Sequence, residues 1–255
     1  MKKIIAFDLD GTLAPTKSHF TERMVNMFNH LLETYEVCVI SGGKYELFQR
    51  QFLTQITTDP MLLSKLHLMP TSGTRYYRFE GSEWVEKYAE NIDLEDRTRI
   101  ATALEEGYLE AGYSLENTYG KIVEDRESQV SLSTLGQEVV SELGDQGIKL
   151  KEEWDPDGTK KKALVAIIAP KIPDFEVRAA GFTTIDVTKR GIDKAYGMSK
   201  LMESTGFSKE DILFMGDSLS PGGNDYAVAA YGIDCIAVRS WEDTAYAIEG
   251  IVSIN

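Results

Sequence analysis

The chain has few cysteines, no long apolar segment and little positive charge. Its two cysteines, Cys38 and Cys235, both lie in apolar stretches, which favours buried free thiols over a disulfide or a metal-binding pair. No apolar run approaches the length that spans a membrane. Lys2 and Lys3 are followed by only four apolar residues and then Asp8, which is too short for a signal peptide. We therefore expect a cytoplasmic protein without a membrane partner.

Positive charge is the scarcer sign. The sequence holds 27 Lys and Arg against 41 Asp and Glu, so its formal net charge is -14. A chain of this charge without a basic stripe is not expected to bind nucleic acid. The same charge repels an anionic substrate, so a phosphate would need a local cluster of cations or a metal ion to bind.

The order of apolar segments predicts the fold class. The 255 residues suffice for one large domain or two modest ones. Residues 4–7 and 37–40 are continuous apolar runs of the kind that form buried parallel strands, and residues 20–35 carry apolar side chains at helical spacing. A helix at 193–204 and a strand at 211–215 repeat this order later in the chain. The alternation predicts an α/β fold with a Rossmann-like parallel sheet.

A different pattern begins at about residue 84. The segment from there to residue 184 is richer in charge, with a helix predicted at 94–109 and antiparallel strands within 121–132. We interpret 84–184 as an α+β domain inserted into an α/β core formed by residues 1–83 and 185–255.

The most informative motif is DLDGT, at residues 8–12. It follows the apolar run 4–7, so Asp8 and Asp10 stand at the C-terminal end of a buried strand, where side chains two residues apart point the same way. Open α/β sheets bind their ligands at that end. Two adjacent carboxylates need a cation between them, or one of them must take up a proton. The alternative is an acidic turn without chemistry.

A second acidic motif, GDSLSPGGND at residues 216–225, follows another apolar strand. Asp217 stands at the C-terminal end of that strand, and Asn224 and Asp225 follow a Pro-Gly-Gly loop. Oxygen atoms are the ligands that magnesium prefers. We predict that Asp217 joins Asp8 at a magnesium site, with Asn224 and Asp225 supporting the metal ligands.

Together, these motifs resemble those of the haloacid dehalogenase (HAD) superfamily of phosphotransferases. The resemblance implies that Asp8 is a nucleophile and that Asp10 is a general acid/base. It also implies that Asp8, Asp217 and the Asp10 carbonyl bind a magnesium ion. The inserted domain would then be the cap that selects the substrate.

Two further positions gain weight from this resemblance. Ser41 ends the strand at 37–40, where the superfamily places a Ser or Thr. Its hydroxyl and the amides of Gly42 and Gly43 can donate hydrogen bonds to a phosphoryl oxygen. Lys194 matches the lysine that offsets the charge of the nucleophile and the phosphoryl group. Without the resemblance, these residues would be an ordinary turn and a solvated lysine.

The spacing Gly-Asp-x4-Pro-Gly-Gly-Asn-Asp is similar to that of the eukaryotic-type phosphomannomutases, a type IIB subfamily with its cap inserted late in the core. Lys17 closes an LAPTK stretch similar to the mutases' LTPAR, and Arg126 closes IVEDR, similar to their FIEFR. Thr184 and Asp186, shortly before GIDK, are further cap contacts that the resemblance implies. For Arg126 and Asp186 the alternative is a surface ion pair. The subfamily also implies a homodimer through the cap.

The sequence departs from the mutases where they bind a distal phosphate. Gln137 stands in place of a phosphate-binding arginine, Gly144 falls near the next cap arginine, and Lys17 replaces another. A guanidinium clamps phosphate with two parallel hydrogen bonds, whereas Gln has no charge and Lys acts as a point charge. A mutase must hold one phosphate while the other reacts, so the loss of these arginines favours simple hydrolysis.

We therefore predict a magnesium-dependent phosphatase that acts on a small phosphorylated metabolite, most simply a sugar phosphate, through an aspartyl-phosphate intermediate. The alternative is a phosphomannomutase-like sugar-phosphate mutase, and a non-catalytic sugar-phosphate sensor is the third hypothesis. The sensor is disfavoured because Asp8 and Asp217 are both present.

Overall fold

Two separate sheets organise the chain, of which a computed structural model describes residues 2–253. Met1–Ala89 and Asp193–Asn255 form one compact unit, the core, and Glu90–Ile192 form a second, the cap. The α/β core with an inserted α+β domain is the fold class that the sequence predicts. None of the helices within residues 2–253 has both the length and the hydropathy needed to cross a membrane.

The core is built on a seven-stranded sheet. Its strands, in sheet order, are β11 (Asp234–Ala237), β10 (Ile212–Gly216), β1 (Ile4–Phe7), β2 (Glu36–Ile40), β3 (Leu66–Met69), β4 (Arg75–Glu80) and β5 (Glu83–Ala89). The first five in this order pair in parallel, and β4 and β5 add an antiparallel hairpin at the edge. The carboxyl ends of β10, β1 and β2 therefore meet at one edge of the sheet.

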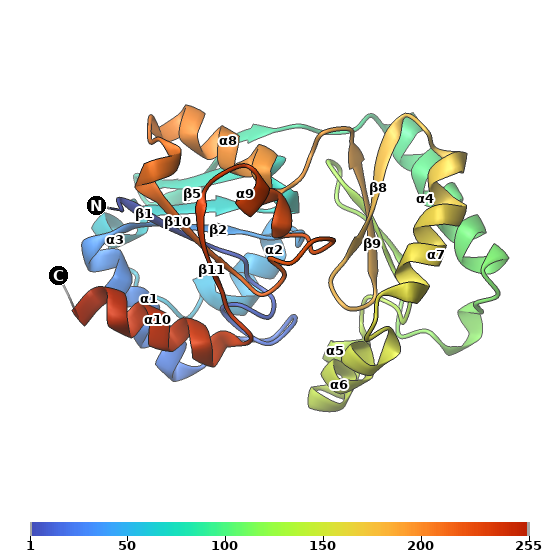
Figure 1. The fold of residues 1–255 in the computed structure, drawn as a ribbon, viewed down its shortest axis with the longest axis horizontal. Coiled ribbons are helices and arrows are strands. Elements are labelled where there is room, and N and C mark those ends of the chain that lie inside the picture. The colour runs from blue at the N-terminus through green and yellow to red at the C-terminus, as the bar shows by residue number, and fades with distance from the viewer. Residues whose placement is uncertain (1, 254–255) are drawn as a thin grey trace. The chain divides into compact units, whose positions relative to one another are not determined.

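Helices cover both faces of this sheet. Alternate residues of β1 face opposite sides: Ile5 packs with α1 (Glu22–Thr34) and α10 (Trp241–Ser253), and Ile4 packs with α8 (Lys194–Thr205) and α9 (Tyr226–Ala230). In Figure 1, α1 and α10 lie on one side of the sheet and α8 on the other. Because both faces of the sheet are buried, the parallel strands are continuous apolar runs in the sequence. The remaining core helices are α2 (Tyr45–Phe48), η1 (Gln49–Leu53), α3 (Pro60–Leu63), η2 (Thr71–Gly73) and η5 (Lys209–Asp211).

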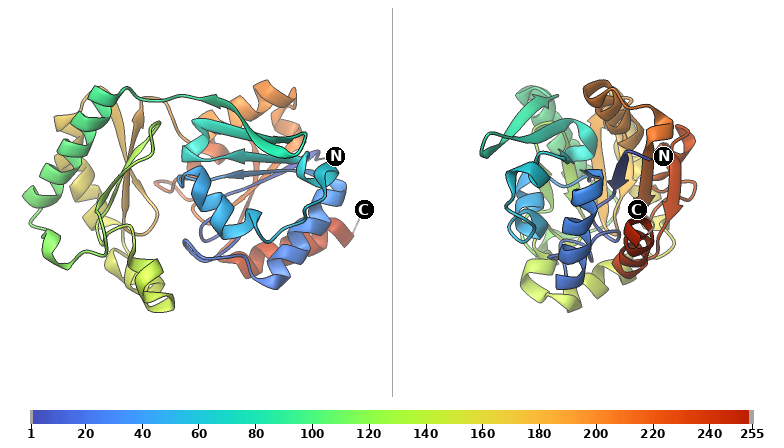
Figure 2. Two further views of the ribbon diagram at one scale, coloured as in Figure 1. Left: turned by 180° about the vertical axis from the view of Figure 1, so that it is seen from behind. Right: turned by 90° about the vertical axis from the view of Figure 1, so that its left-hand side faces the viewer.

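The cap is a four-stranded antiparallel sheet with helices on one face. Its order is β6 (Val123–Asp125), β7 (Val130–Ser133), β9 (Thr184–Lys189) and β8 (Phe175–Ala180). Two helices, α4 (Leu94–Glu110) and α7 (Thr159–Ile168), lie side by side against this sheet (Figure 2) and share its apolar core. The other cap helices are η3 (Leu115–Asn117), α5 (Val139–Leu143), α6 (Asp145–Trp154) and η4 (Ala169–Lys171).

The structure moves the expected domain boundaries by several residues. Residues 84–89 belong to the core, because β5 pairs with β4 along its length. Residues 185–192 belong to the cap, because β9 pairs with both β7 and β8. The two cysteines are free, as expected, but only Cys38 is buried, whereas Cys235 is half-buried.

One buried polar cluster lies within the core sheet. His67 on β3 is 1% exposed, with Nε2 at 2.5 Å from a Glu36 carboxylate oxygen and Nδ1 at 2.8 Å from the Tyr76 hydroxyl. A neutral ring satisfies both contacts if Nε2–H donates to Glu36 and Nδ1 accepts from Tyr76. Burial lowers the pKa of His67 to about 4, although Glu36 acts in the opposite direction; Arg78 lowers it further.

This cluster predicts a loss of stability in mild acid. Below pH 6.5 the unfolded chain protonates His67, while the folded chain resists protonation until about pH 4. The free energy of unfolding should therefore fall as the pH is lowered, by about 2 kcal/mol between pH 7 and pH 5 from this residue. Urea unfolding over that range should show a correspondingly smaller loss in His67→Gln. The exposed His30→Gln variant is the control, and an equal pH dependence in all three proteins would contradict the assignment.

Candidate active site

Four predicted residues converge at the carboxyl edge of the core sheet. Asp8 directly follows β1, Ser41 follows β2 and Asp217 follows β10, three neighbouring parallel strands. Lys194 is the first residue of α8, whose N-cap Asp193 accepts a hydrogen bond from the Tyr196 backbone N–H at 3.0 Å. The fold thus brings together side chains from three distant parts of the sequence.

A buried ion pair network joins Asp8, Lys194 and Asp225. The Lys194 ammonium lies 2.5 Å from Asp8 Oδ1 and 2.5 Å from Asp225 Oδ1, and all three residues are at most 4% exposed. The second oxygen of Asp225 accepts the Ser218 backbone N–H at 3.0 Å. Burial alone lowers the pKa of Lys194, but Asp225 and Asp8 outweigh it and raise this pKa, so the ammonium stays charged.

Three carboxylates gather around the same point. One oxygen each from Asp8, Asp217 and Asp225 lies within 4.8 Å of the others. Burial raises the pKa of Asp8 well above its ordinary value, and the charges of Asp225 and Asp217 raise it further, while Lys194 opposes them. A hard divalent cation fits this group, because its oxygen donors are those magnesium prefers and because they carry more negative charge than Lys194 offsets. Asp225, predicted to support the metal ligands, belongs to the carboxylate group itself, and Asn224 is half-buried in the same loop.

Asp10 has a different environment from Asp8. Its Oδ1 accepts the Lys17 backbone N–H at 2.6 Å and a side-chain N–H of Gln51 at 3.0 Å. Gly11 follows with a positive φ of 86°, and a Cβ there would lie 2.6 Å from Asp217 Oδ2. Glycine suits position 11 for two reasons: its backbone adopts the positive φ readily, and it leaves room for the Asp217 carboxylate.

The loop that carries Ser41 is held by a hydrogen bond within itself and by hydrogen bonds from η2. Ser41 is 3% exposed and its hydroxyl oxygen accepts the Gly43 backbone N–H at 3.2 Å, which leaves the hydroxyl hydrogen to be donated. The Gly43 amide, predicted to bind a phosphoryl oxygen, donates inside the loop in this structure, so its role toward a substrate stays a prediction. Thr71 and Ser72 donate their backbone N–H groups to the carbonyls of Gly43 and Ser41, each at 2.9 Å.

Two of the predicted cap residues, Thr184 and Asp186, lie on β9 of the cap sheet, and Arg126 and Gln137 lie in loops that follow β6 and β7. Arg126 pairs with Glu124 at 2.9 Å, and Asp186 accepts the Ser131 hydroxyl at 2.6 Å. Gln137 donates its amide to the Ile122 carbonyl at 3.4 Å, and Thr184 is half-buried at the start of β9. The Arg126 side chain is only 7% exposed, so its pair with Glu124 is not the surface ion pair given as the alternative, and its role toward a substrate stays a proposal.

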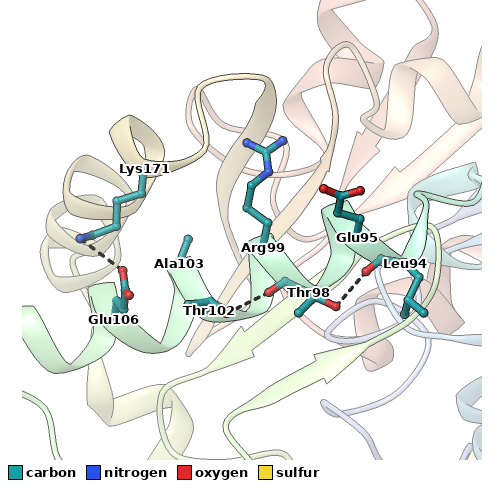
Figure 3. Close-up of a pocket in the computed structure, with 8 residues that line it drawn as sticks. All are labelled: Leu94, Glu95, Thr98, Arg99, Thr102, Ala103, Glu106 and Lys171. Atoms are coloured by element: carbon teal, nitrogen blue, oxygen red, sulfur yellow. Dashed lines mark hydrogen bonds and ion pairs between the residues drawn. The ribbon is translucent and has the colours of Figure 1, made fainter.

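A hollow of about 760 Å³ on the cap lies along α4 (Figure 3). Its two basic side chains are paired with carboxylates, Arg99 with Asp96 at 2.7 Å and Lys171 with Glu110 at 2.9 Å. None of the residues predicted for the site lines it. The chemistry therefore points to the acidic cluster of the core rather than to this hollow.

Sequence reasoning missed Gln51, which contacts Asp10 from 41 positions away. It lies in η1, a π-helical turn, and is 1% exposed. A glutamine in the polar run Gln49-Arg50-Gln51 carries no sequence signal for such a contact, because the pairing exists only in the folded chain.

Comparison with known proteins agrees with this arrangement. The sequence profile of the haloacid dehalogenase-like hydrolases matches residues 5–228. The chain belongs to this family. Phosphomannomutases are among its relatives: that of Spinacia oleracea is 23% identical over 229 residues, covering 89% of this chain and 86% of the relative. The enzyme of Encephalitozoon cuniculi is 24% identical, covering 95% and 91%.

Solved structures share the fold of this chain. An IMP-bound mutant of the IMP-nucleotidase of Plasmodium falciparum has a TM-score of 0.70 at 15% identity, covering 100% of this chain and 67% of that one. A haloacid dehalogenase-like hydrolase from Bacteroides thetaiotaomicron has a TM-score of 0.60 at 16% identity, covering 98% and 100%. The family membership makes the chain a phosphohydrolase or phosphotransferase, with a phosphomannomutase-like sequence.

The carboxylate cluster predicts stabilisation by magnesium. A cation that binds only the folded core raises its melting temperature, by about 5 °C or more at a hundredfold excess over the dissociation constant. Chelator-stripped protein should show this rise in calorimetry, and Asp217→Ala should abolish it. Glu33→Ala, which removes an exposed carboxylate from α1, should retain it. A melting temperature that ignores magnesium would count against the site.

Proposed function

We propose that the protein is a magnesium-dependent phosphatase that hydrolyses a small phosphate monoester, most simply a sugar phosphate. The observation that carries the proposal is the Asp8 carboxylate, held 2.5 Å from a buried ammonium and grouped with two further carboxylates at the ligand-binding edge of the sheet. A buried acidic residue in such a position is more suited to covalent chemistry than to stabilising the fold.

Asp8 is the nucleophile in this proposal. Its free oxygen attacks phosphorus in line, the bond from phosphorus to the ester oxygen breaks, and an aspartyl phosphate forms. Asp10 gives its proton to the departing alkoxide and then takes one from the water that releases inorganic phosphate. Asp8, Asp217 and Asp225 would hold magnesium, whose charge offsets that of the phosphoryl oxygens when it is bound.

The other core residues supply positive charge and orient the reacting groups. Lys194 is already committed to Asp8 and Asp225, so it fixes the nucleophile and contributes positive charge beside the phosphoryl group. The hydroxyl hydrogen of Ser41, which the contact with Gly43 leaves available, would donate to a phosphoryl oxygen. Arg126, Thr184, Asp186 and Lys17 are proposed as contacts to the rest of the substrate.

A sugar-phosphate mutase is the second candidate. The relatives at 23–24% identity are phosphomannomutases and cover most of the chain, which favours it. Against it stands Gln137, whose uncharged amide already donates to the Ile122 carbonyl, where the resemblance expects an arginine. We therefore place hydrolysis first. A non-catalytic sensor is less favoured, because it would have no use for the Asp8–Lys194 pair. The cytoplasmic location and the homodimer through the cap remain proposals from the sequence.

Replacing the nucleophile should abolish turnover without unfolding the core. Asp8→Asn keeps the side-chain shape but removes the attacking oxygen charge, so phosphate release should fall by about a thousandfold or more. Release of inorganic phosphate from a panel of phosphate esters with magnesium measures this, and circular dichroism checks the fold. Asp145→Asn, on the cap surface, is the control. Activity within tenfold of the wild type would remove Asp8 from this role.

Product analysis separates the phosphatase from the mutase. With mannose 1-phosphate and magnesium, phosphorus NMR should show inorganic phosphate accumulating and little of the 6-phosphate isomer. Gln137→Arg should bind a hexose bisphosphate about tenfold to a hundredfold more tightly, because one charge-assisted hydrogen bond contributes roughly 1.5–3 kcal/mol. Efficient isomerisation by the wild type that depends on a bisphosphate activator would establish the mutase instead.

A further inference from the structure

Gln51 is a buried amide at the site to which the mechanism above gives no role. Its side-chain nitrogen donates to Asp10 Oδ1 at 3.0 Å and to the Ser18 carbonyl at 3.0 Å. Its backbone carbonyl accepts the Phe20 N–H at 3.0 Å, so both ends of the residue are fixed to the segment that follows the DLDGT motif. The residue is 1% exposed, which means that these bonds form in the absence of competing solvent.

The orientation of this amide is determined by its partners. Asp10 Oδ1 and the Ser18 carbonyl are both acceptors, so the nitrogen must face them and the oxygen must face away. That oxygen, Oε1, accepts no hydrogen bond from any residue between 2 and 253. A buried carbonyl without a donor destabilises the fold, and an apolar side chain of similar size would avoid this cost. Packing alone therefore does not account for a glutamine at this position.

The backbone at Gln51 is also unusual. Gln49–Leu53 form a π-helical turn directly after α2. Such turns are rare, and they occur frequently at functional sites. The buried rings of Phe48 and Phe52 flank Gln51 and anchor this turn in the core, so the amide is held on a rigid element.

We propose that Gln51 is a positioning residue for Asp10, and this inference rests on the proposed phosphatase function. Gln51 and the Lys17 backbone N–H both bond Oδ1, and within residues 2–253 no hydrogen bond reaches Oδ2. The two donors thereby fix the plane of the carboxyl group and leave Oδ2 to exchange a proton with the ester oxygen and then with water. Without Gln51, Asp10 keeps its chemistry but samples other rotamers.

The dependence on the leaving group tests this role. An alkyl leaving group needs a proton from Asp10, whereas p-nitrophenolate departs without one. In Gln51→Leu and Gln51→Glu, we expect kcat/KM for mannose 6-phosphate to fall by about thirtyfold or more, and that for p-nitrophenyl phosphate by about threefold or less. Asp10 also activates the water that hydrolyses the aspartyl phosphate, so the kcat for p-nitrophenyl phosphate should fall if that second step limits turnover. Gln55→Leu, an exposed glutamine nearby, should change neither substrate.

An equal loss for both esters in the two Gln51 variants would show a merely structural role and overturn the proposal, as would no loss for either. A second readout does not depend on activity. The side-chain amide signals of Gln51 in a nitrogen-15 NMR spectrum, assigned by their absence in Gln51→Glu, should move in Asp10→Ala and stay in place in Glu33→Ala. Signals that ignore Asp10→Ala would also overturn it. If the wild type hydrolyses neither these two esters nor any other ester of the panel, the proposed function fails, and the NMR comparison still decides whether Gln51 holds Asp10.

Discussion

The ammonium of Lys194, buried between Asp8 and Asp225, is the interaction on which the rest of the site depends. Taking one of these charges out of water costs several kcal/mol, and removing one partner of a buried pair typically destabilises a protein by about 3–5 kcal/mol. The fold can bury such a group only if the remaining polar atoms also form hydrogen bonds. The second oxygen of Asp225 accepts the Ser218 backbone N–H, and Asp193 caps the helix that carries Lys194.

The position of Lys194 depends in turn on how closely α8 approaches its neighbours. Gly197, one turn into α8, faces Gly73 in the loop after β3, and a Cβ on Gly73 would lie 2.4 Å from the Gly197 Cα. The same loop carries three consecutive residues with positive φ, including Thr71 at 50°, a conformation that a β-branched residue rarely adopts. Because Thr71 and Ser72 also hold the Ser41 loop, one strained segment fixes both the hydroxyl and the helix that bears the ammonium.

Local sequence patterns predict the site residues that stand at the ends of strands. Asp8, Ser41 and Asp217 each follow a continuous apolar run, and parallel pairing places such ends together whatever the intervening sequence. Four features lack a local signal. The strand β5 is rich in charge because it lies at the sheet edge, so it was assigned to the cap. The helices α5 and α6 follow a Gly-containing turn and were not predicted. Gln51 reaches Asp10 only through tertiary packing, and the use of the Gly43 amide inside its own loop is likewise visible only in the fold.

The charge of the site connects the acidity of the whole chain to its proposed chemistry. Three carboxyl groups meet one ammonium, so with all three ionised the cluster carries two negative charges before any phosphate arrives, in a chain whose formal net charge is -14. The charge of Lys194 is already shared between two carboxylates, because both of its short contacts are to Asp8 and Asp225. A divalent cation would cancel both negative charges and offer the phosphate an attractive site, whereas an additional lysine would cancel only one of them. In the proposed mechanism, the cation would therefore supply most of the attraction for the substrate, and Lys194 would mainly hold Asp8 in line.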